Sequence, residues 1–445
     1  MHLLVELPPA MHCGGCRRGF AFMKSALTKV ALGVGSLSLA IAGAASAGGL
    51  KREGYNIDLL FDPSPFASEA TATYVSPNRK LNNVRDTNPR NGEGTGASNG
   101  VKDTPGYWMP RVGLKAGFGE AVDCLVDYSE PWGVHTNPGP NWVGANDNIQ
   151  TKVSSHNYGA TCSYKFQLGR GQLRFLGGAF YQELSGFKEQ LVAPVPAITG
   201  SNLYGNGVGH LELGGNGMGW RIGTAYEIPE IALRASLVYN SEVRLDDITG
   251  KMDLTQVPAF IDPRNPLLGR VTSIFGSAVM PQTLKFSLQS GVAPDWLAFG
   301  SVEWIQWSKL QSIAFCPEAT RAIACTDGGP TEATSLDLLY RDGWTIQGGL
   351  GHKFSEQWSG GASITWDRGT STGVGYQSDT WSLGLGASYT PGANVELRLA
   401  GALGVMTSGS SGAVVRDGAI YGQQVAYTFG NDLVSAVSAN LKIRW

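Results

Sequence analysis

The segment Val437-Ser-Ala-Asn-Leu-Lys-Ile-Arg-Trp445 closes the chain and decides the fold class. Its apolar residues occupy every second position, and Ser438, Asn440, Lys442 and Arg444 stand between them. Because successive side chains of a β-strand point to opposite faces, this alternation predicts a strand with one apolar and one polar face. A final amphipathic strand that ends in an aromatic residue is typical of barrels delivered to the outer-membrane barrel assembly machinery.

The same alternation recurs along most of the chain. It predicts fourteen strands, at about 67–76, 108–118, 121–130, 154–167, 171–185, 216–228, 231–243, 282–292, 296–308, 340–353, 357–367, 378–389, 393–407 and 434–445. Most of these reach the roughly 9 to 11 residues that a tilted strand needs to cross a bilayer. We therefore expect an all-β protein, a transmembrane antiparallel β-barrel of about 14 strands over residues 67–445.

Two features favour a membrane barrel over a soluble β-sandwich, in which strands also alternate. Aromatic residues such as Trp358 and Trp381 gather near the predicted strand ends, as in the aromatic girdles of outer-membrane barrels. Short turns also alternate with long segments, which predicts tight turns on one side of the membrane and long outer loops on the other. The long outer loops are expected at about 189–215, 248–279 and 309–339.

Composition and charge exclude several classes of protein. Gly contributes 61 of the 445 residues, about twice its usual share of ~7%, which argues against a helix-rich enzyme. The formal net charge is only -2 and Lys and Arg form no block, so no nucleic-acid partner is expected. The histidines after the predicted cleavage site stand singly, at no metal-ligand spacing, and no nucleophile elbow or short-range pairing of a nucleophile with a histidine is found on one strand face, so we expect no metal, no cofactor and no enzymatic activity.

The first 47 residues carry an export signal. Lys24 and Lys29 precede an apolar stretch that ends in the signal-peptidase pattern Ala45-Ser46-Ala47. We therefore expect a signal peptide over residues 23–47 and an upstream artefact of start-site choice over residues 1–22. No later apolar run approaches the ~18 to 20 residues of a membrane-spanning helix. Export and a barrel together predict the outer membrane of a Gram-negative bacterium.

Four cysteines follow the predicted cleavage site, and an even number in an oxidising compartment favours disulfides. Cys316 and Cys325 flank a polar segment, so we expect a disulfide between them that staples a long exposed loop. Cys124 and Cys162 either pair with each other or stay apart on neighbouring strands.

Residues 48–66 precede the first predicted strand and show no alternation. They are either periplasmic or folded into the barrel lumen as a plug, and the pattern leaves both alternatives open. Lys51 and Arg52 in this segment, and Arg444 in the last strand, are possible partners for a ligand carboxylate. Charges inside a barrel lumen more often pair with acidic residues of the wall, which is the alternative interpretation.

Two predicted outer loops are unusually apolar. Exposed apolar loops are costly in water unless they pack on each other or bind a hydrophobic compound, and the two alternatives are compatible. The candidate ligand-binding residues are Leu191, Val195 and Ile198 in the first loop, and Phe260, Ile261, Leu267, Leu268, Ile274 and Phe275 in the second.

Three stretches are similar to those of a known family. They are residues 225–242 (AYEIPEIALRASLVYNSE), residues 280–284 (MPQTL) followed by the hairpin 292–308, and residues 340–342 (YRD) followed by 351–359 (GHKFSEQWS). With these stretches the chain resembles the FadL/TodX-type outer-membrane transporters of long-chain fatty acids and other hydrophobic compounds.

The resemblance implies a monomeric fourteen-stranded barrel with an N-terminal hatch in its lumen. A ligand would settle in a hydrophobic groove between the outer loops 189–215 and 248–279, and would then enter a pocket near the hatch at 48–66. Hatch movement would release it sideways, into the outer-membrane lipid, beside a kinked third strand at 121–130. This third strand contains no internal Pro or Gly that would force a kink, so the sequence does not decide whether the strand is kinked. A general or structural porin is the alternative function, followed by an outer-membrane hydrolase.

Overall fold

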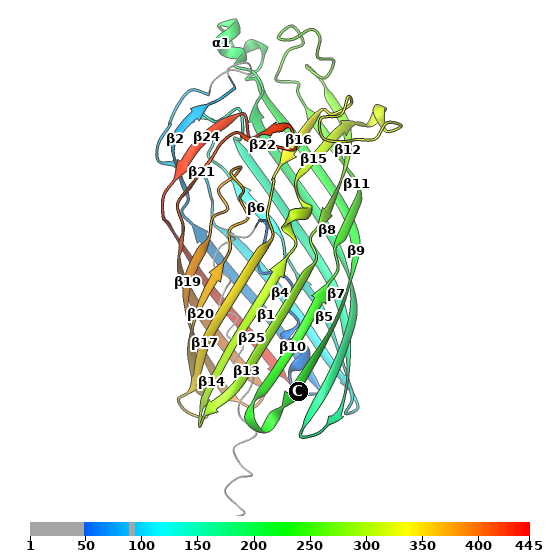
Figure 1. The fold of residues 1–445 in the computed structure, drawn as a ribbon, viewed down its shortest axis with the longest axis vertical. Helices are drawn as coiled ribbons and strands as arrows, with labels where there is room; N and C mark the ends of the chain where they lie inside the picture. Colours follow the sequence, from blue (N-terminus) through cyan, green and yellow to red (C-terminus); the bar gives the residue numbers. More distant parts are fainter. Residues whose placement is uncertain (1–48, 89–93) are drawn as a thin grey trace, which may run out of the picture.

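The computed structural model describes residues 49–88 and 94–445. The predicted signal peptide at 23–47, the predicted artefact at 1–22 and Gly48 of the predicted hatch lie outside these residues. The described chain folds into a tall barrel with its long loops gathered at one end and its C-terminus at the other (Figure 1). In the described residues no helix is long and apolar enough to cross a bilayer.

Fourteen antiparallel strands form the wall. They are β1 (Phe66–Pro77), β4 (Tyr107–Phe118), β5 (Val122–Ser129), β7 (Gln150–Leu168), β8 (Gly171–Leu191), β9 (Val208–Ile228), β10 (Leu233–Asn240), β13 (Thr283–Ala293), β14 (Trp296–Ile305), β17 (Gly343–Lys353), β18 (Trp358–Asp367), β19 (Thr380–Gly392), β20 (Val395–Met406) and β25 (Asp432–Arg444). β1 pairs with both β4 and β25, which closes the sheet. Each strand matches one predicted strand, so the predicted barrel is confirmed.

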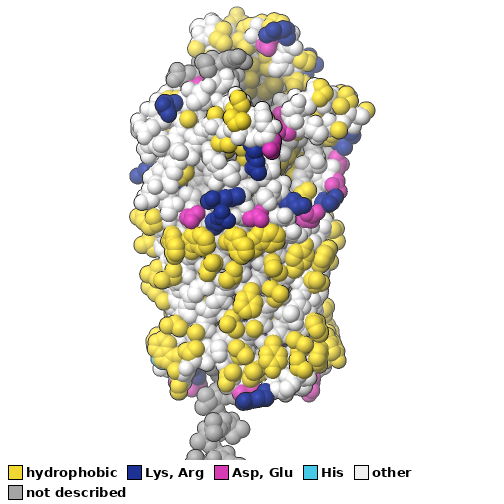
Figure 2. Space-filling view, in the orientation of Figure 1, with side chains coloured by type: hydrophobic (Ala, Val, Ile, Leu, Met, Phe, Trp, Pro, Cys, Tyr) yellow, Lys and Arg dark blue, Asp and Glu magenta, His cyan; other side chains and the backbone are white. Residues whose placement is uncertain are grey.

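Side chains of the wall alternate between the outer surface and the lumen. On β25, Leu441 and Ile443 are 39% and 37% exposed, whereas Lys442 between them is 3% exposed. A band of hydrophobic side chains surrounds the lower part of the visible face, and a row of charged side chains borders it above (Figure 2). This outward apolar band is the surface that a bilayer requires, because lipid tails solvate apolar groups and exclude charged ones.

The wall continues above the apolar band as long ribbons. β8 continues to Leu191 and β9 begins at Val208. β11 (Val243–Asp253) pairs with β12 (Val271–Met280). The connecting loops are therefore shorter than predicted, at 192–207 and 254–270. The first of them contains α1 (Val195–Thr199) and η2 (Asn202–Tyr204). The sequence prediction ended the strands too early because the alternation weakens where both faces meet water or other loops.

Further short strands at the outer end were not predicted. β2 (Lys80–Asp86), β3 (Val101–Lys102), β21 (Gly409–Ser411) and β24 (Val425–Phe429) form a four-stranded sheet, and β22 (Val414–Arg416) pairs with β23 (Ala419–Tyr421). Within the predicted loop 309–339, β15 (Ser312–Pro317) pairs with β12 and with β16 (Thr334–Asp337). The remaining elements are β6 (Gly133–Thr136), η1 (Asp58–Phe61), η3 (Pro229–Ile231), η4 (Trp307–Lys309) and η5 (Glu318–Thr320).

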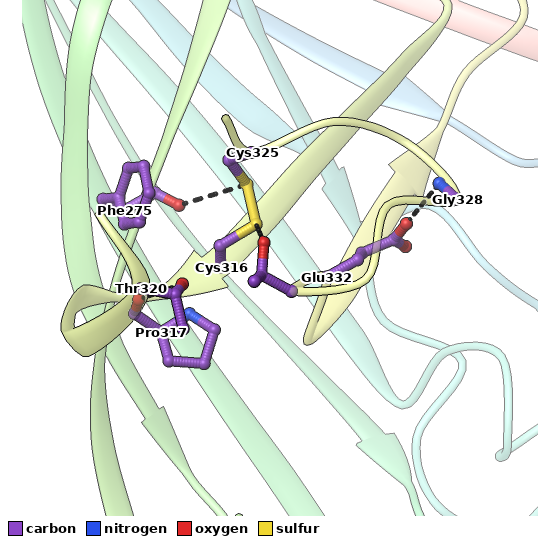
Figure 3. Close-up of a disulfide and its surroundings, with 8 residues drawn as sticks. Phe275, Cys316, Pro317, Thr320, Cys325, Gly328 and Glu332 are labelled. Carbon is purple, nitrogen blue, oxygen red and sulfur yellow. Dashed lines mark hydrogen bonds between the residues drawn. A yellow bond between two sulfur atoms is a disulfide. The ribbon is translucent and has the colours of Figure 1, made fainter. Parts of the chain in front are cut away.

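Both cysteine pairs are joined by disulfides. Cys124 on β5 lies directly opposite Cys162 on β7, with 4.0 Å between their Cα atoms. Cys316 and Cys325 staple the segment that follows β15, and Phe275 of β12 lies beside them (Figure 3). The guanidinium carbon of Arg321, inside the stapled segment, lies 4.6 Å from the centroid of the Phe275 ring. The staple therefore holds this loop against the β11–β12 ribbon.

Candidate functional site

The N-terminal segment, residues 49–65, packs against inward-facing residues of the wall. Leu59, Leu60 and Phe61 of η1 form a buried cluster with Leu125 of β5 and with residues of β8 and β9. The amino group of Lys115 on β4 also donates to the backbone oxygen of Asp62, at 2.9 Å. The segment therefore contacts residues of several wall strands.

All charged side chains of the N-terminal segment face oppositely charged residues of the wall. The pairs are Lys51 with Glu303 at 2.7 Å, Arg52 with Glu130 at 3.6 Å, Glu53 with Arg111 at 3.3 Å, Asp58 with Arg234 at 3.6 Å, and Asp62 with Lys442 at 3.3 Å and Arg444 at 2.9 Å. Except for the pair of Arg234 with the partly exposed Asp58, these pairs are largely buried, and removing one partner is costly because the other charge stays buried without compensation. The segment is thus held by ionic contacts along its length.

The three basic residues predicted as carboxylate partners already bind carboxylates of the protein. Lys51 and Arg52 pair as described, and Arg444 contacts both Asp62 and Glu396. Burial alone would lower the pKa of Lys51, but the nearby carboxylates of Glu303 and Asp367 raise it. Lys51 therefore stays charged, and its charge is balanced inside the wall.

The third strand of the barrel is broken where it meets the N-terminal segment. Ser129 of β5 lies opposite Asn157, and Gly133 of β6 lies opposite Ser154, so three residues of this strand face two residues of β7. The middle residue of the three is Pro131, which has no N–H for a strand ladder. The prediction placed this strand at 121–130, and the break begins at its last residue.

The N-terminal segment supplies hydrogen bonds at this break. The backbone N–H of Arg52 donates to Pro131 O at 2.9 Å, and the N–H of Gly133 donates to Leu50 O at 2.7 Å. Lys51 and Trp132 thereby form an antiparallel bridge. Groups that a neighbouring wall strand would normally satisfy are satisfied by the N-terminal segment.

The break leaves a gap in the wall between β4 and β6. β6 pairs with β7, and in the described chain no ladder joins it to β4, whose residues Tyr107–Met109 pair with β1 alone. The guanidinium carbon of Arg52 lies 4.4 Å from the centroid of the Tyr107 ring. A cavity of about 40 Å³ adjoins it, lined by Tyr107, Gly133 and His135 among others. Arg52 thus occupies the gap.

A single cluster of buried apolar residues connects the outer loops with the N-terminal segment. We call it the apolar cluster. Its members include Val195, Val257 and Leu268 from the outer loops, Ile248, Met252 and Ile274 from the β11–β12 ribbon, Trp132, Phe180, Trp307 and Tyr340 from the wall and its connections, and Leu50 and Tyr55 from the N-terminal segment. The cluster therefore links the outer loops with the N-terminal segment.

Aromatic rings form the inner end of the apolar cluster. The Trp132 ring meets Trp307 edge-on at 5.2 Å between centroids and Tyr55 at 5.5 Å. Tyr55 also lies 4.9 Å from Phe180. Gly49 adjoins this group at a positive φ of 59°, and a Cβ there would lie 2.7 Å from the Trp307 ring. Glycine is therefore required where the N-terminal segment passes the aromatic group.

The predicted groove residues divide into three groups. Val195, Leu268 and Ile274 belong to the apolar cluster, and Ile261 and Leu267 pack against it. Phe260 and Ile198 are exposed at the outer end, where Phe260 contacts Tyr204. Leu191 packs on a different cluster beneath the outer sheet, and Phe275 faces Arg321. Ile274 and Phe275 lie on β12 rather than in a loop.

Sequence reasoning missed a buried polar group beside Tyr55 and Phe180. Arg221 of β9 is 1% exposed and its guanidinium carbon lies 5.5 Å and 5.4 Å from the centroids of these two rings. Its Nε and Nη2 atoms, and Nε2 of Gln182, have no hydrogen-bond partner among the described residues. The nearest carboxylate, that of Asp127, stands 3.6 Å away. Alternation places Arg221 inside the barrel, but many other polar residues share that pattern.

The model of the family described as "Outer membrane protein transport protein (OMPP1/FadL/TodX)" matches residues 34–373. The chain belongs to this family. The FadL/TodX resemblance is thereby confirmed, and with it the location of this barrel in the outer membrane and its class, a transport protein.

Curated relatives of this FadL/TodX-family barrel carry a more specific name. The "Long-chain fatty acid transport protein" of Escherichia coli O6:H1 is 24% identical over 373 residues, which cover 76% of this chain and 79% of the relative. The protein of the same name from Salmonella typhi is 24% identical over 365 residues, which cover 76% and 80%.

Solved structures share the fold of this family member. A Pseudomonas aeruginosa FadL homologue superposes with a TM-score of 0.68 at 16% identity, covering 89% of this chain and 96% of the other. The Pseudomonas putida toluene transporter TodX gives a TM-score of 0.56 at 15% identity, covering 92% and 98%.

Proposed function

We propose that this barrel transports long-chain fatty acids or similar hydrophobic compounds by groove capture, movement of the N-terminal segment and lateral release. The observation that carries the proposal is the apolar cluster, which runs from Val195 and Leu268 in the outer loops to Leu50 and Tyr55 in the N-terminal segment. The names of the curated relatives support the same class of cargo.

Exposed apolar residues at the outer end suit the first step, capture. Phe260 and Tyr204 stack edge-on at 5.7 Å and are both exposed, as are Ile198 and Leu203. Each CH₂ group of a ligand that leaves water for such a surface contributes about 0.8 kcal/mol to the free energy of binding. A long acyl chain therefore binds tightly enough to need an active means of release.

Movement of the N-terminal segment supplies that release. The segment contributes Leu50 and Tyr55 to the apolar cluster and Arg52 to the gap between β4 and β6. A single displacement of the N-terminal segment would therefore change the inner end of the apolar cluster and uncover the gap between β4 and β6. An exit through the gap leads into lipid and spares an apolar molecule the passage through the charged lower lumen.

The surroundings of Arg221 favour a cargo with a carboxylate over a plain hydrocarbon. Two guanidinium nitrogens and the Gln182 amide offer unused donors beside the aromatic end of the apolar cluster. A carboxylate that accepts these hydrogen bonds would be held by charge-assisted contacts, which are stronger than neutral ones. The Arg221→Met variant is expected to lose preference for a fatty acid over the matching alkane.

Uptake of labelled oleate tests the function directly. A Gram-negative host that lacks its own long-chain fatty acid transporter should gain oleate uptake when it expresses this protein. In planar bilayers, the purified barrel should conduct few ions, because the N-terminal segment fills the lumen. Large steady conductance without oleate uptake would favour the alternative of a general or structural porin. Ester hydrolysis by the pure protein would favour the second alternative, an outer-membrane hydrolase.

Closure of the wall within one chain supports a further proposal, that the protein works as a monomer. β1 and β25, the first and last strands of the wall, pair along their length in a single chain, from Ala67 with Arg444 to Pro77 with Val434. A second subunit is not needed to complete the barrel. Delivery by the barrel assembly machinery follows from the terminal strand and is part of the same proposal.

A further inference from the structure

A second compartment lies at the outer end of the barrel. It is a cavity of about 420 Å³ whose lining comes from the loop before β7, from β16, from the 374–377 loop and from β24. It adjoins the apolar cluster, because Leu50 and Tyr340 belong to both and Leu336, another lining residue, packs against the cluster. Unlike the apolar cluster, this cavity is lined in part by charged residues.

The charge of the cavity lining is predominantly negative. Asp103, Asp147, Glu332 and Asp337 contribute four carboxyl groups, and Lys188 is the one cationic side chain among the described lining residues. Carboxylates that share a poorly solvated space favour a cationic occupant, because a positive charge offsets their mutual repulsion.

Two buried oxygen atoms of the lining lack hydrogen-bond donors. Asp103 is 3% exposed, and its Oδ2 atom has no partner in the described part of the chain. The same holds for Oε1 of Gln377, which follows Tyr376, the residue whose hydroxyl hydrogen-bonds to the Asp103 carboxyl group. Buried polar atoms are nearly always satisfied, and an occupant that donates hydrogen bonds would satisfy these two acceptors.

The rest of the lining suits an organic body. Trp142, Tyr376 and Tyr427 present aromatic rings to the cavity, and Leu50 and Leu338 present aliphatic side chains. Aromatic faces attract cations, and aliphatic surface binds alkyl groups. A hydrated metal ion would make no use of these groups.

We propose that this cavity binds an organic primary ammonium ion, whose N–H groups donate to Asp103 and Gln377 and whose apolar body lies on the aliphatic lining. The class combines three properties that the lining calls for: a positive charge, hydrogen-bond donors and apolar surface. The proposed site shares Leu50 and Tyr340 with the apolar cluster but binds its ligand through charged and polar lining residues that the cluster lacks, and it stands independently of the fatty acid proposal.

Calorimetric titration of the full-length protein in detergent tests the proposal, with hexylammonium as the probe. Hexan-1-ol has nearly the same shape without the charge, and hexanoate carries the opposite charge. Hexylammonium should bind at least about tenfold more tightly than either. Equal binding of hexylammonium and hexan-1-ol would overturn the proposal, since it would reveal a purely apolar site.

Two variants connect the binding to the proposed acceptors. At pH 8, where the Asp103 carboxyl group is ionised and hexylammonium is still charged, Asp103→Asn keeps the shape but removes the charge, and it should weaken hexylammonium binding at least about tenfold while oleate uptake is unchanged. Asp246→Asn removes an exposed carboxylate on β11 and should bind as the parent does. Gln377→Leu removes the second acceptor, and its binding should also weaken, which keeps the test valid if Asp103→Asn fails to fold. Unchanged affinity in the folded Asp103 and Gln377 variants would contradict the proposal.

Discussion

Lys51 and Trp132 lie opposite each other in an antiparallel bridge, flanked by the hydrogen bonds from Arg52 N to Pro131 O and from Gly133 N to Leu50 O. The bridge joins the N-terminal segment to the third wall strand at the point where that strand is broken. It also lies beside Arg52, which occupies the gap in the wall. If the segment moves during transport, this bridge must open.

A disulfide across the bridge should therefore stop transport. The two residues lie opposite each other between the flanking hydrogen bonds, the close type of antiparallel pair. Cys124 and Cys162, directly opposite each other on neighbouring strands, show that such a pair can be joined. The oxidised Lys51→Cys/Trp132→Cys variant should bind oleate and fail to take it up, and a reductant should restore uptake.

The controls for this experiment are the two single variants and the parent protein with and without reductant. They separate the cross-link from the loss of either side chain and from reduction of the native disulfides. Equal oleate uptake by the oxidised double variant and by the single variants would exclude movement of the segment at this bridge.

Buried and exposed apolar residues of the loop 254–270 should respond differently to substitution. Leu268 is 5% exposed and Phe260 is 55% exposed. Leu268→Ser should destabilise the loop by about 3 kcal/mol, because it removes a buried side chain from the apolar cluster, and should make the loop sensitive to protease. Phe260→Ser should leave protease resistance unchanged and weaken oleate binding several-fold.

Val415→Ser is the matched control for this pair, because Val415 is an exposed apolar residue of another outer segment. It should affect neither protease resistance nor oleate binding. Comparable oleate binding by the Phe260 and Val415 variants would argue against capture at this loop.

Loss of the Asp62 charge should destabilise the barrel. Its carboxylate faces both Lys442 and Arg444 of β25, so Asp62→Asn would leave two buried cations with fewer counter-charges. We expect a loss of about 3 kcal/mol in the free energy of unfolding. The urea midpoint, followed by the electrophoretic shift of the folded barrel, measures it. Glu356→Gln, which removes the exposed partner of Lys353, should leave the midpoint in place.

Stability should decline as the pH rises through the titration of Asp103. Burial raises the pKa of this carboxyl group from 3.8 to about 7, with Asp147 adding to the shift and Tyr376 and Arg79 opposing it. Between these two pH values the folded protein binds one more proton at this site than the unfolded chain. The free energy of unfolding therefore falls as the pH rises from about 4 to about 7.

The Asp103→Asn variant should lack this part of the decline. Urea midpoints of the parent and the variant at pH 5 and pH 8 give the comparison, in which contributions of other groups, including Asp147, cancel. A parent and a variant with the same pH dependence would show that Asp103 ionises normally in the folded protein.

The sequence alone determined the wall. Alternation is a local property with a period of two residues, so it can be recognised in each strand separately, as in Leu441, Lys442 and Ile443. The aromatic residues near strand ends, such as Trp358 and Trp381, and the alternation of short turns with long loops then favoured a membrane barrel over a soluble sheet. The apolar character of Val195, Leu268 and Ile274 likewise indicated that the outer loops handle hydrophobic contacts.

Only the tertiary structure decided how the lumen is filled and where the wall opens. Lys51 meets Glu303 and Asp62 meets Lys442 across hundreds of residues, and no spacing in the sequence encodes these pairs. The break at Pro131 is stable because the N-terminal segment supplies the missing hydrogen bonds. Arg221 and Asp103 stand out for the same reason: their significance lies in the partners they lack, and that depends on residues brought together from all around the barrel.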